Sequence, residues 1–199
     1  MPPVFDPRPV VLEGRHVRLE PLERRHLPGL VAAARDPATF QYFLTPPLGE
    51  ESEMTKWLDQ ILKGQTAGTD VGWATLRTSD NRVVGATTYL DIRRVNRGLE
   101  IGNTWITPEA QRTAVNTETK FLQLRHAFED LGAWRVQLKT DERNTRSCAA
   151  IERLGAKFEG ILRQYQARYD GYVRNTARFS LTAAERPAVK AGLEAKLAR

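Results

Sequence analysis

The sequence predicts an α/β (α+β) protein in which a single mixed, mostly antiparallel, seven-stranded sheet is flanked by helices. Hydrophobic residues alternate with polar ones along several short segments, as they do in half-buried strands. Other segments carry hydrophobic residues three and four positions apart, which is the spacing of an amphipathic helix. Short turns join most neighbouring strands and favour antiparallel pairing, but one helix separates two strands that should run parallel.

The N-terminal part supplies the first strand and two helices. Residues 10–22 alternate as a strand that a turn around Gly14 interrupts. Residues 24–35 and 50–62 show helical spacing, and a proline-rich loop at residues 45–49 separates them.

Three strands and a long helix occupy the centre of the chain. Residues 71–76, 83–90 and 99–106 alternate as strands with short connections. Residues 117–131 return to helical spacing, and Gly132 ends this helix. The segments predict an antiparallel meander followed by a crossover helix.

The C-terminal part completes the sheet. Residues 134–139 form the fifth strand, which should lie parallel and adjacent to the strand at residues 99–106 because a crossover helix joins them. Residues 144–154 form a short helix, and residues 157–169 and 172–181 form a final hairpin.

The length of 199 residues predicts a single domain over residues 1–199, with a proline-rich leader at residues 1–9 and a C-terminal helix or tail at residues 184–199. The prolines of the leader argue against a secretory signal. Hydrophobic residues make up 41% of the chain, and no segment is apolar enough to span a bilayer. We therefore expect a soluble, cytoplasmic protein without a membrane partner.

The formal charge of +6 favours anionic partners without selecting one class. Basic residues are spread along the chain and form no stripe, so a nucleic-acid partner is not expected. The single cysteine, Cys148, allows no intramolecular disulfide, and the three histidines are scattered. We expect no metal site from these residues.

A polar turn follows the strand at residues 99–106. The sequence Glu100-Ile101-Gly102-Asn103-Thr104-Trp105-Ile106-Thr107-Pro108 leads into Gln111-Arg112-Thr113-Ala114-Val115-Asn116-Thr117-Glu118. This segment resembles the acetyl-CoA signature of the GNAT superfamily, in particular of its RimJ/RimL-like branch. In that family a loop of the form Q/R-x-x-G-x-G/A joins a strand to a helix, and backbone amides hold the pyrophosphate at the helix N-terminus.

Ala114 and Asn116 occupy positions where the family has glycine. Asparagine tolerates a positive φ and alanine adds only one methyl group, so the loop is expected to close around phosphate. The alternative is an ordinary polar connection in which Asn116 or Thr117 caps the helix. The resemblance implies these cofactor-binding residues: Trp105, Ile106, Thr107, Gln111, Arg112, Thr113, Ala114, Val115, Asn116, Thr117, Asn144 and Ser147.

A second motif lies between residues 141 and 160. Asn144 and Ser147 stand three residues apart near the start of a short helix that Gly155 ends. They resemble the N-x-x-S helix of the same family, which contacts the pantetheine arm and the sulfur. Asn144 is also among the best N-cap residues, so a capping role accompanies any contact with the cofactor. The resemblance implies a GNAT fold in which the fourth and fifth strands are parallel and splayed.

The resemblance also implies two catalytic residues. Glu100 is the candidate for deprotonating an amine, and a solvated strand carboxylate is the alternative. Ser147 is the candidate for donating a hydrogen bond to the departing thiolate, with Tyr165 and Tyr169 as alternatives. Cys148 adjoins Ser147, but neither motif supplies a histidine partner, so an acyl-enzyme is not expected.

The resemblance therefore predicts an N-acetyltransferase that moves an acetyl group from acetyl-CoA directly to a primary amine. The acceptor stays open between a protein N-terminus, including that of a ribosomal protein, a peptide and a small molecule. Residues 40–64 and 160–171 are expected to lie on the acceptor side, and a homodimer is compatible with the sequence. The alternative function is a non-catalytic acyl-CoA-binding sensor or interaction module of the same fold.

Overall fold

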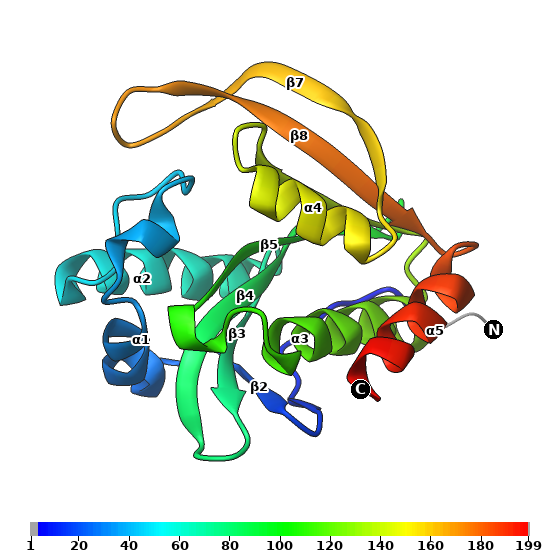
Figure 1. Cartoon of the computed structure of the whole chain (residues 1–199), viewed down its shortest axis with the longest axis horizontal. Coiled ribbons are helices and arrows are strands. Elements are labelled where there is room, and N and C mark those ends of the chain that lie inside the picture. Colours follow the sequence, from blue (N-terminus) through cyan, green and yellow to red (C-terminus); the bar gives the residue numbers. More distant parts are fainter. Residues whose placement is uncertain (1–3, 199) are drawn as a thin grey trace.

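The computed structural model describes residues 4–198 and contains one eight-stranded sheet (Figure 1). The strands are β1 (Leu12–Glu13), β2 (Val17–Pro21), β3 (Val71–Arg77), β4 (Arg82–Arg93), β5 (Gly98–Ile106), β6 (Arg135–Asp141), β7 (Lys157–Ala167) and β8 (Val173–Thr182). They follow the order β1-β2-β3-β4-β5-β6-β8-β7 across the sheet. Among these described strands β5 and β6 are parallel and all other neighbours antiparallel. The mixed sheet with a parallel central pair confirms the predicted fold class.

Helices cover both sides of the central strands. In Figure 1, α1 (Leu27–Ala33) and α2 (Glu51–Ala67) lie on one side, and α3 (Ala114–Arg125), α4 (Thr145–Arg153) and α5 (Arg186–Leu197) lie on the other. The short helical turns are η1 (Arg24–His26), η2 (Pro37–Phe40), η3 (Pro108–Ala110) and the π-helical η4 (His126–Asp130), which continues α3. Buried hydrophobic residues form one core cluster on each side of the sheet.

The two ends of the chain differ from a simple leader and tail. Residues 1–3 of the predicted leader lie outside the described residues, and Phe5 packs into the core cluster beneath α3 and α5. The predicted C-terminal helix is present as α5, with residue 199 outside the description. Among residues 4–198, no helix has both the length and the hydrophobicity that crossing a membrane requires.

The sheet has eight strands and not seven because the segment at residues 10–22 folds back on itself. β1 and β2 pair with each other, with Leu12 opposite Leu19. The turn between them depends on the Glu118 carboxylate of α3, which accepts three consecutive backbone N–H groups at 2.9, 2.5 and 2.8 Å, those of residues 15, 16 and 17. A Cβ on Gly14 would lie 2.5 Å from Glu118 Cδ, so this position requires glycine. Glu118, the last residue of the first motif, thus fixes the edge of the sheet.

The parallel strands β5 and β6 separate early. They pair at only three positions, Gly98 with Arg135, Leu99 with Val136 and Glu100 with Gln137. Both strands continue beyond this pairing, to Ile106 and Asp141. Six residues of β5, about 20 Å of strand at roughly 3.3 Å per residue, therefore have no strand partner on the β6 side. This is the divergence that the family resemblance implies.

A bulge in β5 lies where the two strands have separated. Between Gly102 and Trp105, two residues of β5 oppose one residue of β4, and Asn103 has a φ of 47°. The extra residue shifts the alternation of side chains. Ile101 and Ile106 consequently pack on the same side of the sheet, whereas Trp105 packs on the other.

We expect Glu118→Ala to lower the free energy of unfolding by about 3 kcal/mol, because three backbone amides lose a charged acceptor. Denaturant titration measures this change. Glu194→Ala, at an exposed position of α5, is the control and should change the free energy by less than about 0.5 kcal/mol. Equal stability of the two variants would show that the turn does not depend on Glu118.

Candidate active site

The unpaired edge of β5 forms the centre of the candidate site. Glu100 and Gln137 form the last pair before the strands part, and the turn that ends in Thr113 lies beyond the other end of β5. Backbone N–H and C=O groups on an unpaired strand edge are free to bond a ligand. A long, narrow ligand can therefore lie along β5, with one end at the turn and the other at Glu100.

The turn before α3 presents backbone amides. Thr113 is the N-cap of α3, and its hydroxyl accepts the N–H of Val115 at 3.2 Å and donates to the carbonyl of Ala110 at 2.7 Å. The first turn of a helix has N–H groups without intrahelical partners, here those of Ala114 and Asn116. Together with the positive end of the helix dipole, these groups suit an anion.

The backbone of this turn differs from the expectation. The positive φ belongs to Arg112, at 62°, and not to Asn116. α3 begins at Ala114, three residues before the predicted start at Thr117, so residues 114 and 116 are helical and need no glycine. The alternative that Asn116 or Thr117 caps the helix was wrong, because Thr113 is the cap.

Gln111 connects the turn to its neighbours. Its Nε2 donates to the carbonyl of Ile106 at 3.1 Å, and its Oε1 accepts from the guanidinium of Arg146 on α4. The turn, the end of β5 and the start of α4 are thereby held together. Sequence analysis did not identify Arg146, because its partner lies 35 residues away.

The side chains at the end of β5 serve the core. Trp105 is buried on the α1 and α2 side, with ring centroids 5.4 Å from Phe40 and 6.4 Å from Trp57. Thr107 is also buried, and Ile106 packs against the other core cluster. What these three predicted cofactor residues offer to a ligand is therefore their backbone.

The start of α4 faces the same opening. The Asn144 side chain is the N-cap and accepts the N–H of Ser147 at 3.0 Å. Ser147 is half-buried, and its hydroxyl has no hydrogen-bond partner within the described part of the chain, so it is available to a ligand. Burial raises the pKa of the neighbouring Cys148 thiol, which disfavours the thiolate and agrees with the exclusion of an acyl-enzyme.

Glu100 lies at the closed end of the opening and is buried, with an exposed fraction of 6%. The alternative of a solvated strand carboxylate was therefore wrong. Its Oε2 lies 2.8 Å from Lys139 Nζ and accepts from Gln137 Nε2 at 3.0 Å. Lys139 also lies over the ring of Tyr165, 5.2 Å from its centroid. Sequence analysis missed Lys139 and Gln137, although alternation along residues 134–139 places them on one face of their strand.

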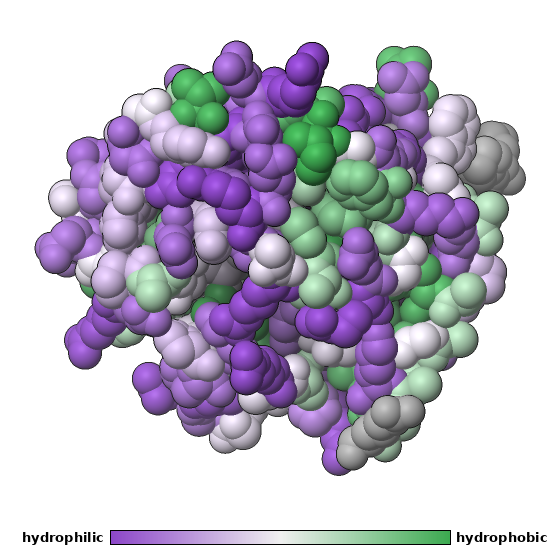
Figure 2. Space-filling view, turned by 45° about the horizontal axis from the view of Figure 1, so that its top comes forward, coloured by the Kyte–Doolittle hydropathy of each residue, from purple (hydrophilic) through white to green (hydrophobic). Residues whose placement is uncertain are grey.

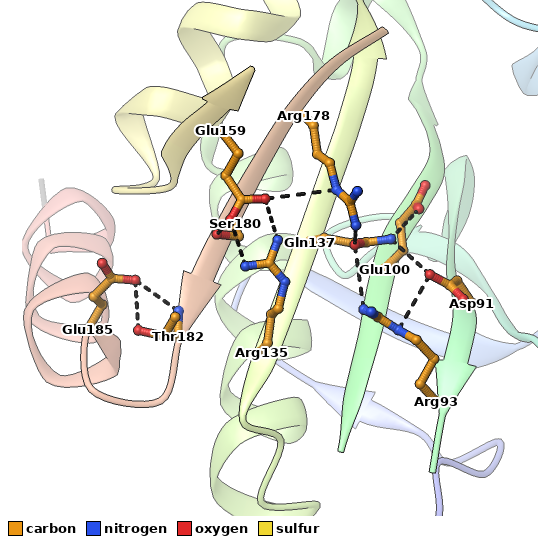
Figure 3. A network of polar contacts seen from close by, with 10 residues as sticks. All are labelled: Asp91, Arg93, Glu100, Arg135, Gln137, Glu159, Arg178, Ser180, Thr182 and Glu185. Atoms are coloured by element: carbon orange, nitrogen blue, oxygen red, sulfur yellow. Dashed lines mark hydrogen bonds and ion pairs between the residues drawn. The ribbon is translucent and has the colours of Figure 1, made fainter. Parts of the chain in front are cut away.

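Glu100 belongs to a polar network that crosses the sheet (Figure 3). At its centre the amide nitrogen of Gln137 donates to Glu100 and to Asp91, at 3.0 and 2.9 Å. The amide oxygen accepts from Arg93 and Arg178 at 3.5 and 2.8 Å. These four contacts set the orientation of the amide, so that its donor side faces Glu100.

The two segments expected on the acceptor side meet each other. The N–H of Tyr169, at the tip of the β7–β8 hairpin, donates to the carbonyl of Leu44 at 3.0 Å. The buried guanidinium of Arg174 donates to the carbonyl of Tyr42 at 3.2 Å. Figure 1 shows the hairpin tip reaching toward the segment before α2. Hydrophilic residues predominate on the face of the molecule shown in Figure 2, with separate hydrophobic patches among them.

Aromatic rings and guanidinium groups alternate on this acceptor wall. The guanidinium of Arg143 stacks on Tyr172, 3.8 Å from the ring centroid, and bonds the buried carboxylate of Asp141 through two nitrogens. This pairing raises the pKa of Arg143 and lowers that of Asp141, so both groups are charged at neutral pH. The wall is therefore a mixed aromatic and charged surface.

A family model for the acetyltransferase (GNAT) domain matches residues 16–157. A GCN5-related N-acetyltransferase from Brucella melitensis is 31% identical, with a TM-score of 0.91 over 99% of this chain and 89% of that one. An assigned acetyltransferase of T. thermophilus is 38% identical, with a TM-score of 0.87 over 96% and 98%. Mycobacterium smegmatis RimJ, in complex with CoA-disulfide, is 19% identical and shares the fold, with a TM-score of 0.79 over 98% and 97%. No curated protein matches the sequence.

We expect Asn144→Ala to lower the free energy of unfolding by about 1 kcal/mol, because α4 loses its cap. We also expect it to weaken binding of acetyl-CoA severalfold, as measured by isothermal titration. Asn144→Asp keeps a capping oxygen and is the matched control. It should restore stability without restoring affinity, and restoration of both by aspartate would show that only the cap matters.

Proposed function

This chain belongs to the GNAT acetyltransferase family, and we propose that it moves the acetyl group of acetyl-CoA directly to a primary amine. The family match and the neighbouring acetyltransferase structures establish an acyltransferase whose acyl donor is acetyl-CoA. They favour an enzyme over a non-catalytic acyl-CoA sensor of the same fold. The amine, the residues that act on it and the RimJ/RimL-like branch are the proposed parts.

The observation that carries this proposal is the unpaired edge of β5 between the turn before α3 and Glu100. Unpaired backbone groups along about 20 Å of strand suit an extended arm that contains amides. The free N–H groups of Ala114 and Asn116 suit a diphosphate at the open end. The residues present therefore fit acetyl-CoA, with its thioester toward the closed end of the opening.

The closed end supplies groups for the transfer itself. An amine must lose its ammonium proton before its nitrogen attacks the thioester carbonyl, and we assign this proton to Glu100, directly or through a water molecule. The new C–N bond then forms as the C–S bond breaks. The free hydroxyl of Ser147 donates to the leaving thiolate, which takes up a proton on release. Lys139 and Gln137 hold the Glu100 carboxylate in place throughout.

The acceptor is proposed to approach on the side of α1 and α2. Leu99 and Ile101 pack on the α3 side of β5, so the Glu100 side chain between them lies on the opposite side. The segments around Tyr42 and Tyr169 border this side. The motifs of the chain support the RimJ/RimL-like branch, for which a protein N-terminus, including that of a ribosomal protein, is a fitting acceptor. A homodimer agrees with the same proposal.

Two measurements test the proposed function. Isothermal titration with acetyl-CoA tests cofactor binding, and a free-thiol assay with a panel of peptides and small amines tests transfer. We expect binding and amine-dependent release of thiol. Absence of binding at millimolar acetyl-CoA would contradict the proposal, and binding without thiol release in the presence of any amine would favour the sensor.

We expect Glu100→Gln to lower kcat by about 100-fold, because the amide cannot accept the amine proton. The Kd for acetyl-CoA should stay within about twofold, since the contact is made with the acceptor. Asp91→Asn changes a carboxylate that contacts the same Gln137 amide and serves as the control, with an expected loss in kcat of a few-fold at most. An unchanged kcat in Glu100→Gln would remove Glu100 from the reaction.

A further inference from the structure

Lys120 is a buried lysine on the α3 side of the separated strands, with an exposed fraction of 6%. Its Nζ lies 2.7 Å from the hydroxyl of Thr104, 3.2 Å from the amide oxygen of Gln123 and 3.4 Å from the hydroxyl of Thr87. All three partners are neutral oxygens. No carboxylate contacts this nitrogen among residues 4–198.

Burial without a carboxylate partner lowers the pKa of Lys120 to about 7, since the low dielectric of the interior disfavours the charged form. The titratable groups on α3 itself and on the elements packed against it have partners of their own: Glu118 with the β1–β2 turn, Tyr89 with a carbonyl of α3, His126 with Asp130, and Lys190 with Glu129. The charge of Lys120 is therefore free to respond to a ligand.

The position of Lys120 connects it to the acetyl-CoA site. Thr104 belongs to the bulge of β5, and its hydroxyl lies 2.7 Å from that of Thr87 on β4. Lys120 thus joins α3 to both strands at the level where β5 has left β6. The same helix begins with the amides of Ala114 and Asn116, which we assign to the diphosphate.

We propose that the Lys120 ammonium positions the bulge of β5 for acetyl-CoA and that binding of the cofactor draws a proton from solvent onto this side chain. The inference rests on the acetyl-CoA site proposed above. Lys120 is a positioning residue in this proposal, because it acts through Thr104 and α3 and does not touch the reacting atoms.

The distance along α3 sets the size of the effect. From Ala114 to Lys120 the helix rises by about 9 Å. At roughly 10 Å and the effective dielectric constant of a protein, one negative charge shifts the ionisation equilibrium of a lysine about tenfold toward the ammonium. A bound diphosphate therefore raises the pKa of Lys120.

The sign of the pH dependence follows from this shift. Because binding raises the pKa of Lys120, affinity is highest where the free protein already carries the proton, below about pH 7. Affinity then falls as the pH rises through the pKa of the bound form. The expected loss is about tenfold in Kd, and most of it should occur between about pH 7 and 9.

The test is isothermal titration of the full chain with acetyl-CoA from pH 6 to 9, in buffers of different ionisation enthalpy. For the wild-type protein we expect the Kd to rise about tenfold over this range, with uptake of a fraction of a proton near pH 7.5. Lys120→Met should bind about tenfold more weakly at pH 6.5, lose this dependence and take up no additional proton. Lys63→Met, at an exposed position of α2, should keep the wild-type profile.

A second pair of variants changes the partner of the ammonium. Thr104→Val removes the nearest hydroxyl and should weaken binding at pH 6.5 by about tenfold, whereas Thr104→Ser should keep the wild-type affinity. Circular dichroism and thermal melting establish that each variant is folded. This pair decides the question if Lys120→Met does not fold.

The outcomes separate this inference from the proposed function. Wild-type affinity, pH profile and proton uptake in Lys120→Met would overturn the role of Lys120 while leaving acetyl-CoA binding intact. Equal affinities of Thr104→Val and Thr104→Ser would do the same. Failure of the wild-type protein to bind acetyl-CoA at any pH would contradict the proposed function itself, and this inference with it.

Discussion

The early end of pairing between β5 and β6 is the constraint on which the site depends. Backbone groups that a neighbouring strand would satisfy are left to a ligand along the rest of β5. The bulge at Asn103 contributes, because an extra residue bends the strand and redirects its side chains. The helices that follow the two strands, α3 and α4, both begin at the open end, so their N-termini face the same ligand.

Burial of Glu100 links the proposed base to the acceptor wall. A carboxylate inside a protein requires a partner, and Lys139 supplies one at 2.8 Å. Lys139 in turn lies over Tyr165 of β7, whose hairpin reaches the segment before α2. Movement of the hairpin by an acceptor would therefore reach Glu100 through a single side chain. This arrangement offers a physical route by which acceptor binding adjusts the proposed base.

α3 carries charged residues where an amphipathic helix has hydrophobic ones. Glu118 and Lys120 are both buried, and each is satisfied differently, by three backbone amides and by three neutral oxygens. Burying such groups costs free energy unless hydrogen bonds replace the lost water. The first half of the helix thus fixes the edge of the sheet and the bulge of β5, and its later residues pack as a conventional apolar face.

The sequence by itself determined the kinds of element, the parallel central pair, the cap at Asn144 and the family, because periodicity, caps and motifs are encoded within a few neighbouring residues. Only the tertiary structure decided that residues 10–22 form two strands, since the Glu118 carboxylate that holds their turn lies about 100 residues away. It also decided the start of α3, the pairing of Glu100 with Lys139 and the burial of Lys120. Burial and charge pairing depend on which distant segments meet, and no local pattern records that.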